Sequence, residues 1–423
     1  MHLERQHQNS KATDDTQPDQ AHAAGRILTA RVGPARAMLA GLCATLVGVG
    51  LSRFAYAPLL PEMVRAGWLS AGAAGVLGAA NLAGYLAGAL GAGWVARRFG
   101  LRRTLRAAML LASVSFALCA WRGQLAWFLP WRVLSGLLGG LLMGLAGPAV
   151  QAAVPVRLHG LAAGLLFSGV GIGIMAGAVL IPVLLPFGLP AAWLALAGTA
   201  LVLAVASWRL WPVTSAPPAT PQGWGGSRSG VRRLLAIYAL SATAATSHMV
   251  WWPDFIARGL GYGAADADGF WFLYGAAVAC CPALFARLAD HIGTQAALAA
   301  LTAVQVAALL LPLLATATPA LLASSVCGGG TAGGVSALAL IRAKELAGDA
   351  SPQLWRGCTA AWGAAQAATG FFLAWVFAVS GTHASIFAAG LAAAVGAAVL
   401  AFWPTGRGQT GRARLDTPPR GTY

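Results

Sequence analysis

The stretch GWVARRFGLRR, residues 93–103, places four arginines between two long apolar runs, 72–96 and 104–121. Runs of about 20 apolar residues are long enough to cross the hydrocarbon core of a bilayer. Charged residues make up 9% of the chain and hydrophobic residues 58%, whereas soluble proteins carry about 25% charged residues. The basic stretch is therefore predicted to connect two membrane-spanning helices of an all-α polytopic membrane protein.

Clusters of polar residues, glycine and proline divide the apolar chain into twelve segments. The predicted spans are 37–61, 72–96, 104–121, 126–150, 160–185, 189–210, 234–256, 269–289, 295–315, 319–341, 355–379 and 384–403. The stretch PVTSAPPATPQGWGGSRSG predicts a linker at 212–231, between six-helix bundles at 37–211 and 234–404. The polar ends, 1–33 and 405–423, are expected to be disordered tails, and the first of them lacks the apolar segment of a signal peptide.

The net charge of +16 comes from basic residues that cluster between the apolar segments. This placement indicates membrane topology, not a nucleic-acid surface. With the N-terminus in the cytoplasm, 23 Lys and Arg fall on the cytoplasmic side and three, Arg65, Arg122 and Arg258, on the other. Basic residues concentrate on the cytoplasmic side of membrane proteins, so both termini are predicted to be cytoplasmic. The two remaining arginines, Arg53 and Arg132, fall inside spans.

The two halves of the sequence repeat each other in their connections. PEMVRAG begins at Pro61 and PDFIARG at Pro253, an offset of 192 residues. GWVARRFG begins at Gly93 and ARLADHIG at Ala286, an offset of 193 residues. Duplicated helical halves joined by a linker are typical of secondary transporters, in which two bundles rock about a site between them.

These features resemble the major facilitator superfamily (MFS) of transporters along residues 37–404. The signature Gly-x-Leu-Ala-Asp-Arg-x-Gly-Arg-Arg-Arg of that family is matched at Gly93, Arg98, Gly100, Arg102 and Arg103. Arg97 stands where the family has aspartate, whereas the second copy keeps its acid, Asp290. The resemblance implies that this acid faces the start of a helix in the opposite half and acts as a conformational latch. A carboxylate suits a helix N-terminus and an arginine does not, so the first-half latch is in question.

The stretches GLSRFAYAPLLPEM and GYLAGALGAG are similar to a bacterial branch of this family labelled YbfB/YjiJ. That resemblance implies a monomer in the bacterial inner membrane that carries a small-molecule substrate without a cofactor. In the family, the spans here numbered 37–61, 126–150, 234–256 and 319–341 line a central cavity. Three candidate substrate ligands, Arg53, Arg132 and His248, lie at a similar depth on the first three of these spans.

The main hypothesis is that Arg53 binds an anionic substrate. An arginine at the centre of a membrane costs at least about 2.5 kcal/mol, and it is kept where it faces a cavity or a partner. None of the twelve acidic residues lies in the middle of a predicted span. An unpaired arginine facing a cavity favours an anion. The alternative is a structural or gating role for Arg53, in contact with backbone carbonyls or Asp254. For Arg132, the family signature around WRVLSG favours a structural or proton-handling role.

Further candidates for substrate binding and proton coupling lie on other predicted spans or near their ends. Asn81 shares a helix face with Tyr85, and Gln366 shares one with Trp362, because residues four apart align on a helix. Asn81 and Gln366 could orient a substrate or join helices by hydrogen bonds. His248, Glu62 and Asp254 are candidates for proton coupling, although His248 could equally be a packed neutral side chain.

The leading hypothesis is a secondary transporter of a small organic anion that works by alternating access coupled to protons. The alternative is a proton-driven efflux pump for drugs or metabolites, which would be expected to carry an embedded acid for cationic drugs. An enzyme is not expected, because the sequence shows no Walker loop, no Ser/His/Asp set and no Cys or His spacing for a metal. A sensor is not expected either, because no soluble domain is appended.

Overall fold

The computed structural model describes residues 33–55, 58–212 and 227–403, and within these ranges the regular structure is helical. The first half contains α2 (Pro34–Thr45), which continues as the π-helix η1 (Leu46–Ala55), then α3 (Leu59–Arg65), α4 (Ala71–Phe99), α5 (Leu101–Cys119), α6 (Leu125–Ala153), η2 (Val156–Leu158), α7 (His159–Leu184), η3 (Leu185–Phe187) and α8 (Leu189–Ser207). The second half contains α9 (Arg228–Asp254), which continues as η4 (Phe255–Gly259), then α10 (Ala264–Ile292), α11 (Thr294–Leu314), α12 (Thr318–Ala347), η5 (Gly348–Ala350), α13 (Ser351–Ser380) and α14 (His383–Phe402). Nearly all of the two predicted tails and most of the predicted linker lie outside the described residues.

The helices overlap the predicted spans, and the first span, 37–61, takes in most of α2, all of η1 and the start of α3. Ten stretches of the described chain are long and apolar enough to cross a membrane. One of them, Thr318–Ser380, takes in both α12 and α13, whereas α5, which carries Arg102, Arg103 and Arg106, is not among them. The all-helical membrane fold is confirmed, and the count of twelve spans stays a prediction.

The sequence repeat is also visible in the backbone. The helices α4 and α10 both have 29 residues, and each is followed at once by the next helix through a single glycine, Gly100 or Gly293. Both glycines have φ of 84°, in a region that residues with a Cβ rarely enter. The two corresponding connections therefore have the same tight geometry, as the repeated sequences predict.

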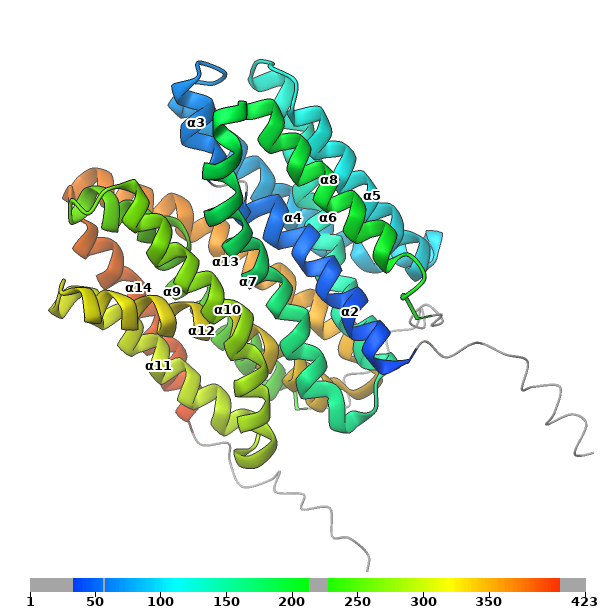
Figure 1. The fold of residues 1–423 in the computed structure, drawn as a ribbon. Coiled ribbons are helices and arrows are strands. Elements are labelled where there is room, and N and C mark those ends of the chain that lie inside the picture. The colour runs from blue at the N-terminus through cyan, green and yellow to red at the C-terminus, as the bar shows by residue number, and fades with distance from the viewer. Residues whose placement is uncertain (1–32, 56–57, 213–226, 404–423) are drawn as a thin grey trace, which may run out of the picture.

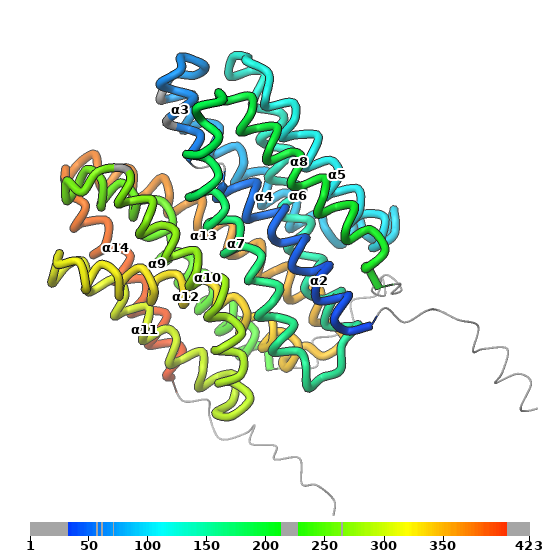
Figure 2. Tube along the Cα trace, viewed as in Figure 1, coloured from blue at the N-terminus to red at the C-terminus, as the bar shows by residue number. Residues whose placement is uncertain are grey.

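The two halves lie side by side (Figure 1). They meet mainly where α7 packs against α10 and α4 packs against α13. The tube in Figure 2 shows that α2, the first described helix, begins on the same side of the bundle as the side on which α14, the last one, terminates. We call this the terminal end, and we call the end that carries α3 the opposite end.

Glycine seams hold the first half together. A Cβ on Gly136 or Gly140 of α6 would lie only 2.0 or 2.1 Å from a backbone oxygen of α4. A Cβ on Gly173 of α7 would lie 2.2 Å from the Cα of Gly50 in η1. Small residues let helix backbones approach closely, which is a common way to pack helices in a membrane.

The halves are in contact toward the terminal end. Along the seam between α4 and α13, Gly93 lies against a side chain of α13, and Gly363 lies against the ring of Tyr85. Nearer the opposite end, a Cβ on Gly78 of α4 or on Gly370 of α13 would have no such neighbour within 4 Å. The contacts that these glycines report along the seam therefore lie toward the terminal end.

Candidate functional site

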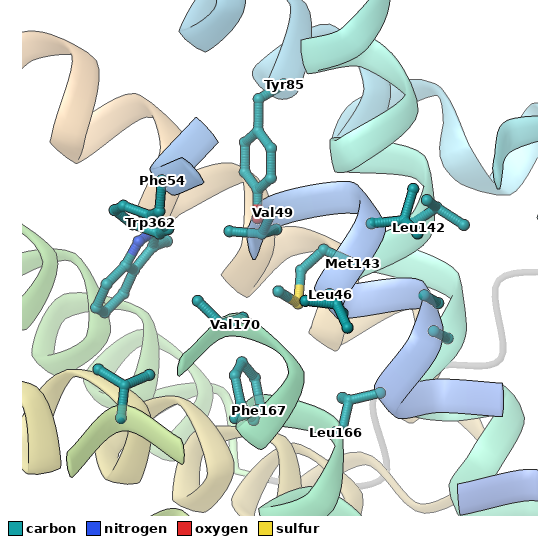
Figure 3. Close-up of a cluster of buried hydrophobic side chains, with 14 of the residues drawn as sticks. Leu46, Val49, Phe54, Tyr85, Leu142, Met143, Leu166, Phe167, Val170 and Trp362 are labelled. Atoms are coloured by element: carbon teal, nitrogen blue, oxygen red, sulfur yellow. The ribbon is translucent and has the colours of Figure 1, made fainter. Parts of the chain in front are cut away.

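A small cavity lies between the two halves, near the middle of the bundle. Its volume is about 50 Å³, well below the range of about 300–1,000 Å³ for ligand pockets. Aromatic side chains form much of its wall: Phe54, Tyr85 and Phe167 from the first half and Tyr238 and Trp362 from the second. Figure 3 shows four of these side chains, with Val49, Met143 and Val170, around the same region.

Of the described residues that line this cavity, Arg53 is the one that carries a charge. It belongs to the π-helix η1, and its side chain is half-buried. Its Nη1 donates a hydrogen bond of 2.6 Å to Oε1 of Gln366, and its guanidinium carbon lies 5.2 Å from the centre of the Phe54 ring. Within the described ranges, no carboxylate lies within 4.0 Å of the Arg53 guanidinium.

Gln366 connects the halves. It lies on α13, is almost fully buried, and accepts from Arg53 of the first half. Its Nε2 lies 2.9 Å from the sulfur of Met249 on α9. One helical turn earlier on α13, the Trp362 ring packs against the Tyr238 ring with centroids 4.7 Å apart. The predicted pair Trp362 and Gln366 thus shares the face of α13 that looks into the interface.

Arg132 and Asn81 lie in the interior of the first half and not among the residues that line the central cavity. The Arg132 Nη2 donates to the carbonyl oxygen of Ser52 at 2.6 Å, and its guanidinium lies 6.0 Å from the Trp193 ring centre. The Asn81 amide donates to the carbonyl oxygen of Arg132 at 3.1 Å. Because Ser52 precedes Arg53, these bonds connect α4 and α6 to the turn that carries Arg53.

His248 is buried inside the second half. Its Nε2 lies 2.9 Å from Oγ of Ser324, and that hydroxyl donates to the carbonyl oxygen of Ala308. Ser324 therefore accepts from His248, which places a proton on Nε2. The His248 ring also packs against the rings of Trp252 and Tyr274. His248 is not among the residues that line the central cavity.

The two acidic candidates lie at the opposite end of the bundle. Glu62 forms an ion pair with Arg65, one turn along α3. Asp254 pairs with Arg258 and also with His383 of α14, whose Nε2 lies 2.9 Å from Oδ2 of Asp254. Sequence reasoning missed His383, because it is the first residue of α14 and lies 129 residues from Asp254 in the chain.

The predicted latch residues occupy the terminal end. Asp290 lies beside the start of α7 in the other half, where a Cβ on Gly160 would be 3.6 Å from its Oδ2. In the first copy, Gly93 packs against Arg356 of α13, and Gly100 makes the tight connection described above. Among the basic residues of that copy, Arg98 lies over the Phe99 ring, whereas Arg102 and Arg103 belong to the first turn of α5. Arg97 lines a second cavity beside the start of α13.

Among the described residues, no group of three His, Cys, Asp or Glu side chains is placed to hold a metal ion. The six cysteines are free. The central site offers one cation, a few hydrogen-bonding amide and hydroxyl groups, and aromatic walls. An arginine beside hydrogen-bonding and aromatic side chains is chemically suited to a negatively charged group.

Comparison with known proteins adds the following. The family model "Uncharacterised MFS-type transporter YbfB" matches residues 45–402. The crystal structure of the human organic anion transporter MFSD10 (TETRAN) covers 87% of this chain and 99% of its own, with a TM-score of 0.71 and 17% identity. The Escherichia coli fucose:proton symporter FucP covers 86% and 97%, with a TM-score of 0.65 and 13% identity. No curated protein is similar to this chain in sequence. At these identities the two structures indicate the fold alone.

Proposed function

Because the chain belongs to the family of MFS-type transporters named after YbfB, we propose that it is a secondary transporter of an organic anion, with Arg53 as the anion ligand. One observation carries this proposal. Among the residues that the structure describes, Arg53 is the single charged one that lines the central cavity, and no carboxylate neutralises it there. Arginine binds carboxylates and phosphates through two parallel hydrogen bonds, which makes it well suited to hold such a solute.

The substrate would replace Gln366 as the partner of Arg53. A cavity of about 50 Å³ cannot hold a small organic molecule, since ligand pockets commonly measure about 300–1,000 Å³. Loading therefore requires the halves to move apart and the bond between Arg53 and Gln366 to break. This coupling links substrate binding to the relative motion of the two halves, as alternating access requires.

The walls of the cavity favour an anion with an apolar or aromatic body. Five aromatic side chains line the cavity together with Arg53, and they offer flat apolar faces with few hydrogen-bonding groups. A sugar would be expected to require more polar side chains. The printed name of the structural neighbour MFSD10 describes an organic anion transporter, which is in keeping with this choice of substrate class.

Proton coupling is part of the proposal. Of the three candidates, we favour Asp254, because the Nε2 of His383 contacts its carboxylate and offers a partner for proton exchange. His248 and Glu62 remain candidates. We further propose that the protein lies in the bacterial inner membrane with both termini in the cytoplasm, from the distribution of its basic residues.

The test is thermal unfolding of the purified full-length protein in detergent, against organic anions, organic cations and neutral drugs. Wild type would be compared with Arg53→Gln and with Arg122→Gln, a control that removes an exposed arginine. A ligand at 100 times its Kd stabilises the folded state by about 2.7 kcal/mol. We expect aromatic carboxylates to raise the Tm of wild type and Arg122→Gln and to leave Arg53→Gln unchanged. Equal stabilisation of all three proteins by cations or neutral drugs would instead favour the efflux-pump alternative.

A further inference from the structure

A second cavity opens at the terminal end, where the first-half latch would otherwise lie. Its volume is about 330 Å³, several times that of the central cavity and within the range of about 300–1,000 Å³ for ligand pockets. It lies between the ends of α4 and α6 in the first half and the region around η5 in the second. The start of α13, with Ser351 and Pro352, forms part of its wall.

Positive charge dominates this cavity. Arg97 lines it from the first half, and Lys344 and Arg356 line it from the second. The one acidic lining residue, Asp349, is mostly exposed and lies 3.8 Å from the Lys344 ammonium. Within the described ranges, neither Arg97 nor Arg356 forms an ion pair. Two like charges thus face each other across the interface of the halves without a shared counter-ion.

A buried donor in the wall also has no protein partner. Gln151 lines the cavity from α6, and only 5% of its surface is exposed. Its side-chain Nε2 is buried and makes no hydrogen bond within the described chain. Leaving a buried amide donor unpaired costs about 1–3 kcal/mol. A ligand oxygen at this position would satisfy it.

Arg356 reaches into the first half through a path that two glycines leave free. A Cβ on Gly93 of α4 would lie 2.8 Å from the Arg356 guanidinium carbon, and a Cβ on Gly144 of α6 would lie 3.5 Å from its Cγ. The guanidinium of the second half is therefore held against the first half, beside Arg97. An anion between them would contact both halves at once.

We propose that this cavity binds a phosphate group, carried either by a soluble phosphate or by the headgroup of an anionic lipid. The two guanidinium groups bind phosphate oxygens in the geometry that arginine favours, and Lys344 adds a third positive charge. The Gln151 amide donates to a further oxygen, and the N-terminal end of α13 favours negative charge. The phosphate supplies the negative charge that Asp290 provides in the second copy, and so it stabilises the closed terminal end. This site is separate from the central cavity and does not depend on the identity of the transported solute.

The experiment measures the apparent Kd for inorganic phosphate of the purified full-length protein, from the shift of Tm during a titration at fixed ionic strength. Sodium chloride serves as the balancing salt and as the control anion. In parallel, the protein is placed in nanodiscs of phosphatidylglycerol and in nanodiscs of phosphatidylcholine. The variants are Arg356→Gln, Gln151→Leu and Arg97→Asp, with Arg209→Gln as the control for loss of an exposed arginine.

We expect Arg356→Gln to bind phosphate at least about tenfold more weakly than wild type and Arg209→Gln to bind it equally. Arg97→Asp is expected to stay folded and to lose the response to phosphate, because its own carboxylate occupies the cavity. Stabilisation by inorganic phosphate identifies a soluble ligand, and stabilisation only in phosphatidylglycerol discs identifies a lipid headgroup. The proposal is overturned if chloride stabilises as well as phosphate does, if neither phosphate nor phosphatidylglycerol stabilises, or if Arg97→Asp and Arg356→Gln respond as wild type does.

Discussion

The interface between the halves contains two corresponding seams, which differ in how closely the helices pack and in the charge at the terminal end. Where α7 meets α10, the backbones are in contact, and a Cβ on Gly171 would lie 2.2 Å from the backbone nitrogen of Ala279. Asp290 then places a carboxylate beside the start of α7. Where α4 meets α13, a cavity of about 330 Å³ lies near the corresponding position, and Arg97 replaces the carboxylate.

The difference shows that a duplicated backbone does not impose duplicated chemistry. The connections at Gly100 and Gly293 have the same φ, yet one carries a cation toward a helix start and the other an anion. A carboxylate stabilises a helix N-terminus, and a cation destabilises it. The seam between α7 and α10 is therefore expected to be the tighter of the two, and the seam between α4 and α13 the one that responds to solutes.

The largest effect on stability is expected for Gly171→Ala. Its new methyl group would meet the backbone of α10, and overpacking of this kind typically costs about 1–3 kcal/mol. Gly78→Ala in α4 is the matched control, because no neighbour lies within 4 Å of its Cβ position, and alanine favours a helix over glycine by about 1 kcal/mol. Thermal unfolding in detergent should therefore show a lowered Tm for the first variant and an equal or higher Tm for the second.

Reversal of the charge at Asp290 is expected to have the second-largest effect, on the population with an open terminal end. Asp290→Arg replaces a favourable contact with the start of α7 by an unfavourable one, which we expect to raise the population with an open terminal end about tenfold, or about 1.4 kcal/mol. Spin labels in place of the exposed residues Arg157 and Arg287, on opposite halves, would report the distance distribution. Arg97→Gln is the counterpart on the other seam, and it should shift the distribution toward closure. A change in the same direction for both variants would contradict the contrast between the seams.

A smaller loss of stability is expected for Gly93→Ala. The atom nearest to its Cβ position is the end of the Arg356 side chain, which can move aside, so the cost should stay below about 1 kcal/mol. The Kd for phosphate should nevertheless rise, because the guanidinium is displaced from the cavity. A loss of stability as large as that of Gly171→Ala would show that the two seams are equally rigid.

The smallest expected effect is a dependence of the Tm on salt concentration. Added sodium chloride screens the repulsion between Arg97 and Arg356, since the Debye length falls from about 10 Å at 0.1 M to about 3 Å at 1 M. In the absence of phosphate, we expect a Tm increase of a few degrees or less for wild type, measured relative to Arg97→Gln. No difference between the two proteins would mean that the two arginines do not act on each other.

Much of the architecture could be predicted from apolar segments, basic connections and the repeated motifs around Gly93 and Ala286. These features are local, and they depend on the thickness of the bilayer and on the rarity of charge inside it. The position of Asp290 beside α7 also agrees with what the family resemblance implies.

The side chains that face the cavity were harder to predict. Arg53 and Arg132 are both single arginines inside apolar spans at a similar depth, yet one lines the cavity and the other lies in the interior of the first half. What separates them is the rotation of each helix, which is set by contacts such as that between Gly173 and Gly50. Tyr238, whose ring packs on Trp362, could be recognised only after α9 and α13 were placed together.

The hydrogen bond between Arg53 and Gln366 has a consequence for the type of transport cycle. It offers Arg53 a partner within the protein that can take the place of a cargo anion, because Gln366 accepts from the only charge that lines the cavity among the described residues. A carrier whose empty form can close is able to return without a load. We therefore expect net flux down a gradient and not obligatory one-for-one exchange, and Gln366→Ala should shift proteoliposome kinetics toward exchange.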